Sequence, residues 1–251
     1  MTRSLGLDGT IVAQTRLGLI DGAAGQLHYC GYNVHDLAER LRWEAVLFLL
    51  WNGELPDAAA LQALQAQLAA LRKLDDAELA LIESLPTTGH GMDVLRAALS
   101  LLAGLHQPAI MGPATVFDDG LRLIAKFPML VAAWARRRQG LAPVEPDADL
   151  GQAEAFLMAL QGRRPEAIEA EALNCYMVLL AEHGLNVSTF VARVAASAQN
   201  DLYAASDAAL ATLKGVAHGG ANEMAMRQFL AIGSPERVAG FVADLLARKE
   251  R

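Results

Sequence analysis

Apolar residues recur at every third or fourth position over most of the chain, which is the spacing of an amphipathic helix. Leu61, Leu64, Leu68 and Leu71 form one such stripe, and Asp57 precedes it as a predicted N-cap. Short polar or Gly/Pro segments separate the stripes and mark helix ends. The predicted helices cover residues 36–40, 43–51, 57–73, 75–84, 92–105, 117–126, 129–138, 150–160, 165–182, 187–199, 201–213, 222–231 and 234–251. The pattern predicts an all-α, multi-helical fold.

Three local signals refine this prediction. Pro128 separates two apolar stripes, and because a proline fits the first turn of a helix, we predict one helix before it and another beginning there. Ser234 before Pro235 predicts a helix N-cap. Residues 10–20 alternate weakly between apolar and polar, and Asp21-Gly22 follows, which predicts a short strand or β-hairpin near the N-terminus.

The length of the chain and the absence of a long linker segment favour one large domain over residues 1–251. The segment 141–149 holds two prolines and three acidic residues, but it is too short for a domain linker. No repeat of 20–50 residues is present in the sequence. Hydrophobic residues make up 53% of the chain, so an all-helical oligomer is a reasonable expectation, because a subunit interface needs additional apolar surface.

Charge and cysteine content restrict the partners and the compartment. The formal net charge of −7 disfavours nucleic-acid binding, which needs a basic field. The apolar runs at 45–51 and 129–135 are too short to span a bilayer, and the first eight residues lack the apolar core of a signal peptide. The two cysteines lie far apart in the sequence, so we expect a reduced, cytoplasmic setting without a membrane partner.

The most distinctive stretch surrounds His218, with three glycines within six residues between two helical segments. The glycines predict a sharp turn that other groups can approach closely. A histidine at the start of the following helix feels the positive end of the helix dipole, which disfavours the imidazolium. A neutral imidazole that donates a hydrogen bond can act as an electrophilic catalyst. The alternative is a Gly-rich turn with an incidental histidine.

His183 and Asn186 form a second candidate group, between the end of one helix and the start of the next. Exposed N–H groups at a helix start favour anions, so a histidine and an asparagine beside them suggest a carboxylate site. Ordinary capping of two helix ends is the alternative. The sequence contains no nucleophile elbow, dinucleotide fingerprint, P-loop or HExxH motif, and no two ligands sit at metal-binding spacing on one helix face, so we expect no bound metal.

Taken in order, several motifs resemble the citrate synthase family, in its bacterial citrate/2-methylcitrate synthase branch. They are GLDG at 6–9, IDG at 20–22, LHYCGY at 27–32, GELP at 53–56, HGMDVLR at 90–96, HGLNVST at 183–189, DLYAA at 201–205 and LKGVAHGGANE at 213–223. The resemblance implies condensation of an acyl-CoA, usually acetyl-CoA, with oxaloacetate. It also implies a mainly helical homodimer, a large domain with a small domain that closes over substrates, and no permanently bound cofactor, acyl-CoA being a substrate.

Residue by residue, the resemblance makes His218 the histidine that hydrogen-bonds the thioester oxygen and stabilises the enolate. It makes His183 a ligand of the 2-oxo acid, with Asn186 beside it. The chain departs from the family at Cys30, where arginine is usual, at Gly91, where proline is usual, and at Gly184, where glutamate is usual.

The family would continue after residue 251 with a Gly-Phe-Gly-His-Arg element, an aspartate base, the carboxylate-binding arginines and most of the coenzyme A site. We therefore expect a truncated chain that comprises the large domain and is inactive alone. A non-catalytic regulatory or assembly partner is the alternative function. Citryl-CoA lyase activity ranks last, because it needs the same C-terminal residues.

Overall fold

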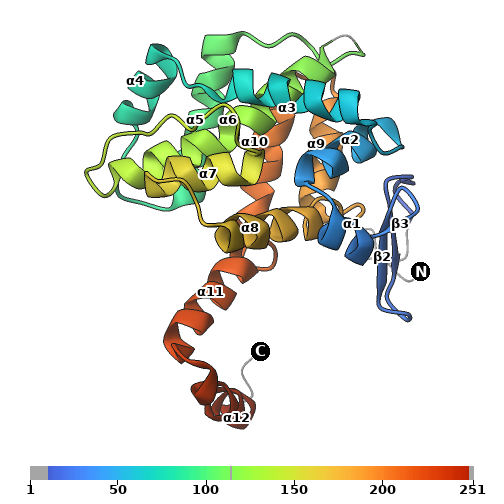
Figure 1. The fold of residues 1–251 in the computed structure, drawn as a ribbon, viewed down its shortest axis with the longest axis vertical. Coiled ribbons are helices and arrows are strands. Elements are labelled where there is room, and N and C mark those ends of the chain that lie inside the picture. The colour runs from blue at the N-terminus through green and yellow to red at the C-terminus, as the bar shows by residue number, and fades with distance from the viewer. Residues whose placement is uncertain (1–10, 114, 249–251) are drawn as a thin grey trace, which may run out of the picture.

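The computed structural model describes residues 11–113 and 115–248, and within these ranges the chain is mainly α-helical with one small sheet, as predicted (Figure 1). The motif at 6–9 and residues 249–251 lie outside the described residues. The elements in chain order are β1 Gly18–Asp21, β2 Gln26–Tyr29, β3 Tyr32–Asn33, α1 Val34–Arg40, α2 Trp43–Asn52, α3 Ala58–Arg72, α4 Asp76–Ser84, α5 Gly91–His106, α6 Val116–Arg137, α7 Gln152–Gln161, α8 Ala167–Leu179, α9 Val187–Ser197, α10 Leu202–Leu213, α11 Gly220–Ile232, the 3-10 helix Pro235–Arg237 and α12 Val238–Arg248.

The sheet is antiparallel in the order β1-β2-β3 and lies at one edge of the molecule, beside α1 (Figure 1). The predicted strand over 10–20 is only partly right, because β1 begins at Gly18, and β2 and β3 come later in the sequence. Asp21 turns the chain between β1 and β2, since its Oδ1 accepts hydrogen bonds from the N–H groups of Ala23 and Ala24. The fully buried Tyr29 anchors the sheet to the helices by donating its hydroxyl to the Leu179 carbonyl at 2.9 Å.

Helix α6 is central to the helical body, where it contacts α3, α4, α5, α7 and α10. One core cluster fills the space between α4, α5, α6 and α10 and includes the fully buried Ile82, Leu99 and Leu130. A second cluster packs α1, α2 and α8 against the sheet, with Val46 and Val178 at its centre. The first cluster includes Tyr203 and so holds α10 against the body, and α9 packs on α10. Of the candidate site residues, His183 and Asn186 precede α9 and His218 follows α10.

The predicted break at Pro128 is wrong, because α6 runs through it as one helix from Val116 to Arg137. Proline lacks the N–H that would bond the carbonyl four residues earlier, which is that of Ile124. Gln152 of α7, only 1% exposed, supplies the missing donor: its Nε2 lies 3.0 Å from the Ile124 carbonyl and 3.3 Å from that of Ala125. A side chain from another helix therefore repairs the interruption that the proline creates.

A buried polar network joins α4, α5, α6 and α10. The carboxylate of Glu78, fully buried, accepts a hydrogen bond from Lys126 Nζ at 2.7 Å and lies 2.9 Å from His106 Nε2. The other ring nitrogen of His106 lies 2.7 Å from the hydroxyl of Tyr203. Burial raises the pKa of this phenol to about 12. The network pairs each buried charge with an opposite or hydrogen-bonding group, as burial requires.

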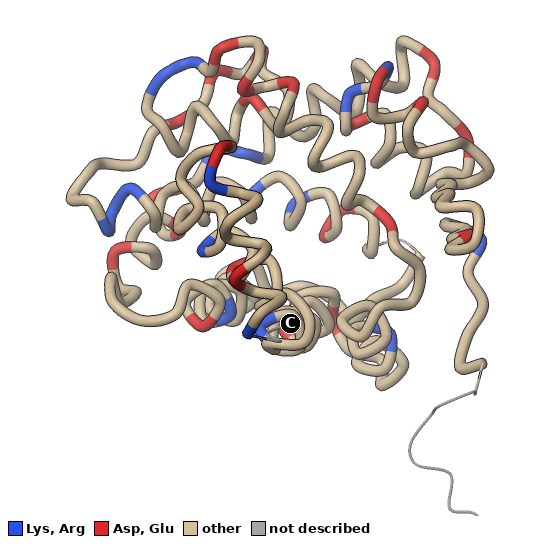
Figure 2. Tube along the Cα trace, turned by 90° about the horizontal axis from the view of Figure 1, so that it is seen from below, with Lys and Arg blue, Asp and Glu red and all other residues tan. Residues whose placement is uncertain are grey.

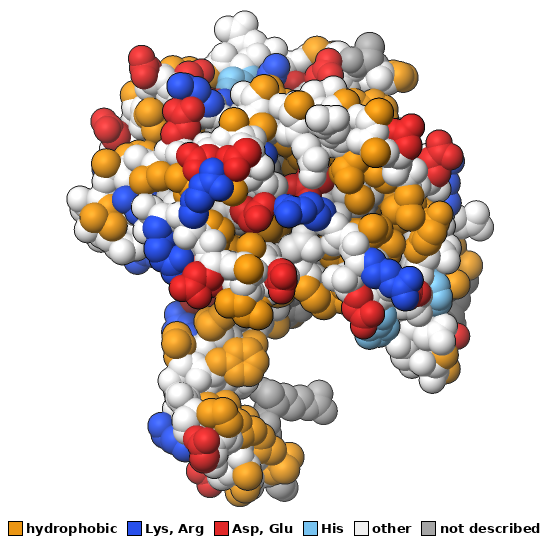
Figure 3. Space-filling view, in the orientation of Figure 1, with side chains coloured by type: hydrophobic (Ala, Val, Ile, Leu, Met, Phe, Trp, Pro, Cys, Tyr) orange, Lys and Arg blue, Asp and Glu red, His pale blue; other side chains and the backbone are white. Residues whose placement is uncertain are grey.

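Helices α11 and α12 project from the body (Figure 1). Neither contains a buried residue, and apolar side chains gather over their surface, among them Phe229, Leu230 and Leu246 (Figure 3). The predicted C-terminal helix from Ser234 is only partly right, because Pro235 begins a short 3-10 helix that leads into α12 at Val238, and Ser234 makes no side-chain capping bond. That residues 1–251 are one large domain stays a prediction.

Acidic and basic residues are interspersed along the trace of the chain (Figure 2). Among the described helices, none has both the length and the apolar character that crossing a membrane requires.

Candidate active site

The turn that carries His218 joins α10 to α11. The His218 and Gly220 N–H groups both donate to the Gly215 carbonyl, at 2.9 and 3.1 Å. A Cβ on Gly219 would lie only 2.4 Å from the Leu213 carbonyl oxygen, so this position has no room for any side chain. The glycines therefore allow a compact turn, as predicted, and place His218 immediately before the N-terminus of α11.

The His218 ring is half-buried and contacts α9. Its Nε2 lies 2.9 Å from Ser188 Oγ, and the same hydroxyl donates to Asn186 Oδ1 at 2.8 Å. Asn186 Oδ1 also accepts the Thr189 N–H at 2.9 Å, which caps α9. The structure therefore brings Asn186 and His218 together through Ser188. Ser188 is a residue to which the sequence alone assigned no role.

This chain of contacts limits where the protons lie. The Thr189 N–H identifies the Asn186 atom it faces as the oxygen, so the Ser188 hydroxyl hydrogen points to Asn186. Ser188 Oγ then accepts the His218 Nε2–H. For a neutral His218 to present Nδ1–H instead, the Ser188 hydroxyl must rotate to donate to Nε2. One hydroxyl rotation therefore decides which nitrogen of His218 can donate to a ligand.

His183 lies three residues before Asn186, in the connection between α8 and α9, and its side chain is exposed. Within the described part of the chain, it makes no hydrogen bond to His218 or Asn186. The next residue, Gly184, has φ of +69°, a left-handed conformation that glycine adopts without strain. Its N–H donates to Glu182 Oε1 at 2.5 Å. The departure from glutamate at position 184 thus fits the local backbone.

Asn186 keeps its capping role and still has a free donor. Its Oδ1 is used by Thr189 and Ser188, whereas no described protein group contacts its Nδ2. The Nδ2 group is therefore able to donate to an oxygen of a ligand such as a carboxylate. Capping and ligand binding, the two interpretations of Asn186 that the sequence left open, are compatible.

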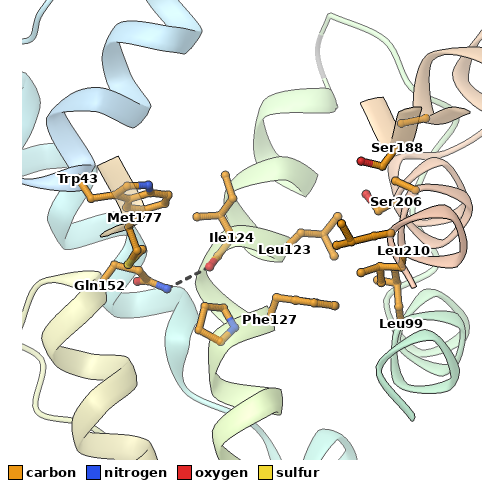
Figure 4. Close-up of a pocket in the computed structure, with 14 residues that line it drawn as sticks. Trp43, Leu99, Leu123, Ile124, Phe127, Gln152, Met177, Ser188, Ser206 and Leu210 are labelled. Atoms are coloured by element: carbon orange, nitrogen blue, oxygen red, sulfur yellow. Dashed lines mark hydrogen bonds between the residues drawn. The ribbon is translucent and has the colours of Figure 1, made fainter. Parts of the chain in front are cut away.

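Ser188 also lines an apolar cavity of 440 Å³, to which α2 and the helices α5 to α10 contribute side chains (Figure 4). Its hydroxyl and that of Ser206 are on one wall, opposite the Gln152 amide that bonds Ile124 (Figure 4). Most of the remaining lining is aliphatic or aromatic. Ser188 therefore stands between the polar His218 group and an apolar interior.

The described residues contain no group of three or more His, Cys, Asp or Glu side chains arranged to hold a metal ion.

Comparison with known proteins supplies the family. The family model described as "Citrate synthase, C-terminal domain" matches residues 6–251. The chain belongs to the citrate synthase family.

Individual relatives agree with this assignment. A 2-methylcitrate synthase of Mycobacterium tuberculosis (strain ATCC 25618 / H37Rv) is 42% identical over 98% of this chain, and citrate synthase 2 of Bacillus subtilis (strain 168) is 39% identical over 100% of this chain. The matched region covers 62% of the first and 68% of the second relative.

Solved structures of citrate synthases share the fold. The enzyme from Thermotoga maritima MSB8 superposes with a TM-score of 0.82 at 33% identity, over 98% of this chain and 65% of that one. The enzyme from Thermoplasma acidophilum, solved with carboxymethyl coenzyme A and oxaloacetate, gives a TM-score of 0.87 at 29% identity, over 97% and 64%. The chain thus spans about two thirds of the length of these citrate synthases.

Proposed function

We propose that this chain provides one side of a citrate synthase-type site, which condenses acetyl-CoA or another short acyl-CoA with oxaloacetate. His218 is the residue that hydrogen-bonds the thioester oxygen of the acyl-CoA and stabilises the enolate as it forms. His183 and Asn186 bind the 2-oxo acid, Asn186 through its free Nδ2. No permanently bound cofactor takes part.

The observation that carries this proposal is the Asn186–Ser188–His218 chain of contacts. It links Asn186, the residue proposed to bind the 2-oxo acid, to His218, the residue proposed to stabilise the enolate, through the Ser188 hydroxyl alone. Once the Ser188 hydroxyl has turned to donate to Nε2, the His218 ring can donate its Nδ1–H to a developing oxyanion, which is electrostatic catalysis. The complex of the Thermoplasma acidophilum relative with oxaloacetate and a coenzyme A derivative supports the same pair of substrates.

By itself, the chain is expected to show no measurable condensation, because the general base and the carboxylate-binding arginines of the family are not matched in it. General acid–base catalysis contributes about 10²–10⁴-fold to rates. Purified chain with acetyl-CoA and oxaloacetate tests this directly. Turnover that disappears on His218→Ala would show that the chain is active alone.

A chimera tests the site residues themselves. The part of the Bacillus subtilis citrate synthase 2 that lies beyond the matched region is joined to residue 251, and release of coenzyme A from acetyl-CoA is measured. The chimera should condense the substrates, and His218→Gln should reduce kcat about 10²-fold or more. A folded chimera without activity would contradict the proposal and favour the non-catalytic, regulatory function.

Two further parts of the proposal concern assembly and compartment. Helices α5 and α9 both pack on α10 and leave large apolar side chains exposed, including Leu105 and Val194, which supports a homodimer. Light scattering on the purified chain would show twice the monomer mass. Cys30 and Cys175 are free thiols, which suits a reduced, cytoplasmic setting.

A further inference from the structure

The first turn of α5 touches the chain on both sides of the His218 turn. Before the turn, Lys214 Nζ lies 2.8 and 2.7 Å from the two carboxylate oxygens of Asp93. After it, Glu223 Oε2 in the first turn of α11 lies 3.3 Å from His90 Nε2. His90 is the N-cap of α5 and Asp93 lies in its first turn, so one helix end holds both ends of the turn.

We propose that this helix end is a clamp that sets the position of the His218 ring, with His90 and Asp93 as positioning residues. The inference rests on the proposed function, because the position of His218 matters for catalysis only if His218 meets the substrate. His90 and Asp93 themselves touch neither the His218 ring nor Ser188.

The turn needs such a clamp because its internal bonds do not locate it. The hydrogen bonds to the Gly215 carbonyl set the shape of the turn, but they leave its distance from α9 and Ser188 open. Helix α11 buries no residue. Among described residues, the His90–Glu223 contact is the one side-chain hydrogen bond or ion pair between α11 and the body.

His90 is oriented for this contact by its capping role. Its Nδ1 accepts the Met92 N–H at 3.2 Å, so Nε2 carries a proton and faces Glu223 Oε2 at 3.3 Å. Glu223 is also bonded by Arg227 at 2.6 Å, which holds the pKa of its carboxyl below the usual range and keeps the acceptor ionised.

The second contact is ionic. Hydrogen bonding by Lys214 holds the pKa of the Asp93 carboxyl below its usual range, so both partners are charged at neutral pH. All four side chains of the clamp are between 39% and 49% exposed. Exposed pairs of this kind change an equilibrium by about 1.4- to 5-fold each, so their effect on the turn is expected to be joint rather than individual.

Hydrogen–deuterium exchange on the full 251-residue chain, with no substrate present, tests the clamp. In the double variant Asp93→Ala/Glu223→Ala, the turn amides, including those of His218 and Gly220, should exchange about threefold to twentyfold faster. The ¹⁵N signal of His218 Nε2 should shift, because its contact with Ser188 is loosened. The single variant Glu223→Gln keeps an acceptor oxygen for His90. With Asp93 unchanged, its turn amides should exchange at the wild-type rate.

Asp207→Ala is the matched control, because it removes a carboxylate that pairs α10 with Arg96 of α5 at 3.2 Å, away from the turn. It should leave turn exchange within about twofold of wild type. A folded double variant with wild-type turn exchange and an unmoved His218 signal would overturn the clamp. Neither readout uses substrate, so an inactive chimera with a clamp-dependent His218 signal would refute only the proposed function.

Discussion

Replacing Gln152 should destabilise the fold only while Pro128 is present. Gln152→Met keeps the size of the side chain but removes the Nε2 donor, which leaves the partly buried Ile124 carbonyl without a partner. A buried acceptor without a partner costs about 1–3 kcal/mol. Gln152 Oε1 is itself buried without a hydrogen-bond partner, so its removal stabilises the fold and offsets part of this loss. The expected net loss is about 1–2 kcal/mol of unfolding free energy.

The Pro128→Ala background supplies the missing N–H from the helix itself. The Ile124 carbonyl then has its ordinary helical partner, so Gln152→Met should cost less than about 0.5 kcal/mol. Urea unfolding followed by circular dichroism, applied to wild type, both single variants and the double variant, gives the interaction energy. We expect a coupling of about 1 kcal/mol or more between the two positions.

Gln139→Met is the matched control for this cycle. Its amide also donates to a backbone carbonyl, that of Ala135 at 3.3 Å, but the side chain is exposed. It should change the unfolding free energy by no more than about 0.5 kcal/mol in either background. Equal costs of Gln152→Met with and without Pro128, to within about 0.3 kcal/mol, would refute the account of how α6 passes its proline.

Two other substitutions test the turn and the buried network. Gly219→Ala should displace the His218 turn and lower the unfolding free energy by about 1–3 kcal/mol, because the new Cβ would overlap the Leu213 carbonyl. The control Gly240→Ala, which has open space around the new Cβ, should leave the unfolding free energy unchanged or raise it. Equal effects would contradict the close approach. Tyr203 has a pKa raised by burial to about 12, so its neutral phenol contributes stability that is complete below pH 10 and is lost as pH rises to about 12. Between pH 10 and 12, the wild type should lose about 3 kcal/mol of unfolding free energy that the Tyr203→Phe variant does not lose, as measured by urea titration at each pH. The same pH profile for both proteins would contradict the buried environment of the phenol.

Local signals in the sequence were sufficient for most elements. Asp57 and Asn186 cap α3 and α9 as predicted, because a capping side chain and its N–H partner lie within three residues of each other. The glycines around His218 likewise predicted the turn, since their effect is confined to a few neighbouring dihedral angles. The family resemblance is confirmed, whereas the substrate-binding roles of His183 and Asn186 stay predictions.

The features that sequence reasoning missed all depend on residues distant along the chain. Pro128 looked like a helix boundary because its compensating donor, Gln152, belongs to another helix. Ser188 meets His218 only after α9 and α10 have packed together, and nothing in either segment alone reveals the contact. An Asn-x-Ser spacing at a helix start was visible, but it also fits a simple cap.

Because α11 projects from the body (Figure 1), small rotations of the His218 turn become large displacements at the far end of this helix. A helix of 13 residues is about 20 Å long, and this one is attached at a single end. A rotation of about 10° at the turn, too small to break its hydrogen bonds, would sweep the far end of α11 through about 3.5 Å. Movements of the His218 turn are therefore magnified at the far end of α11, and a spectroscopic probe on α12 would report them from a distance.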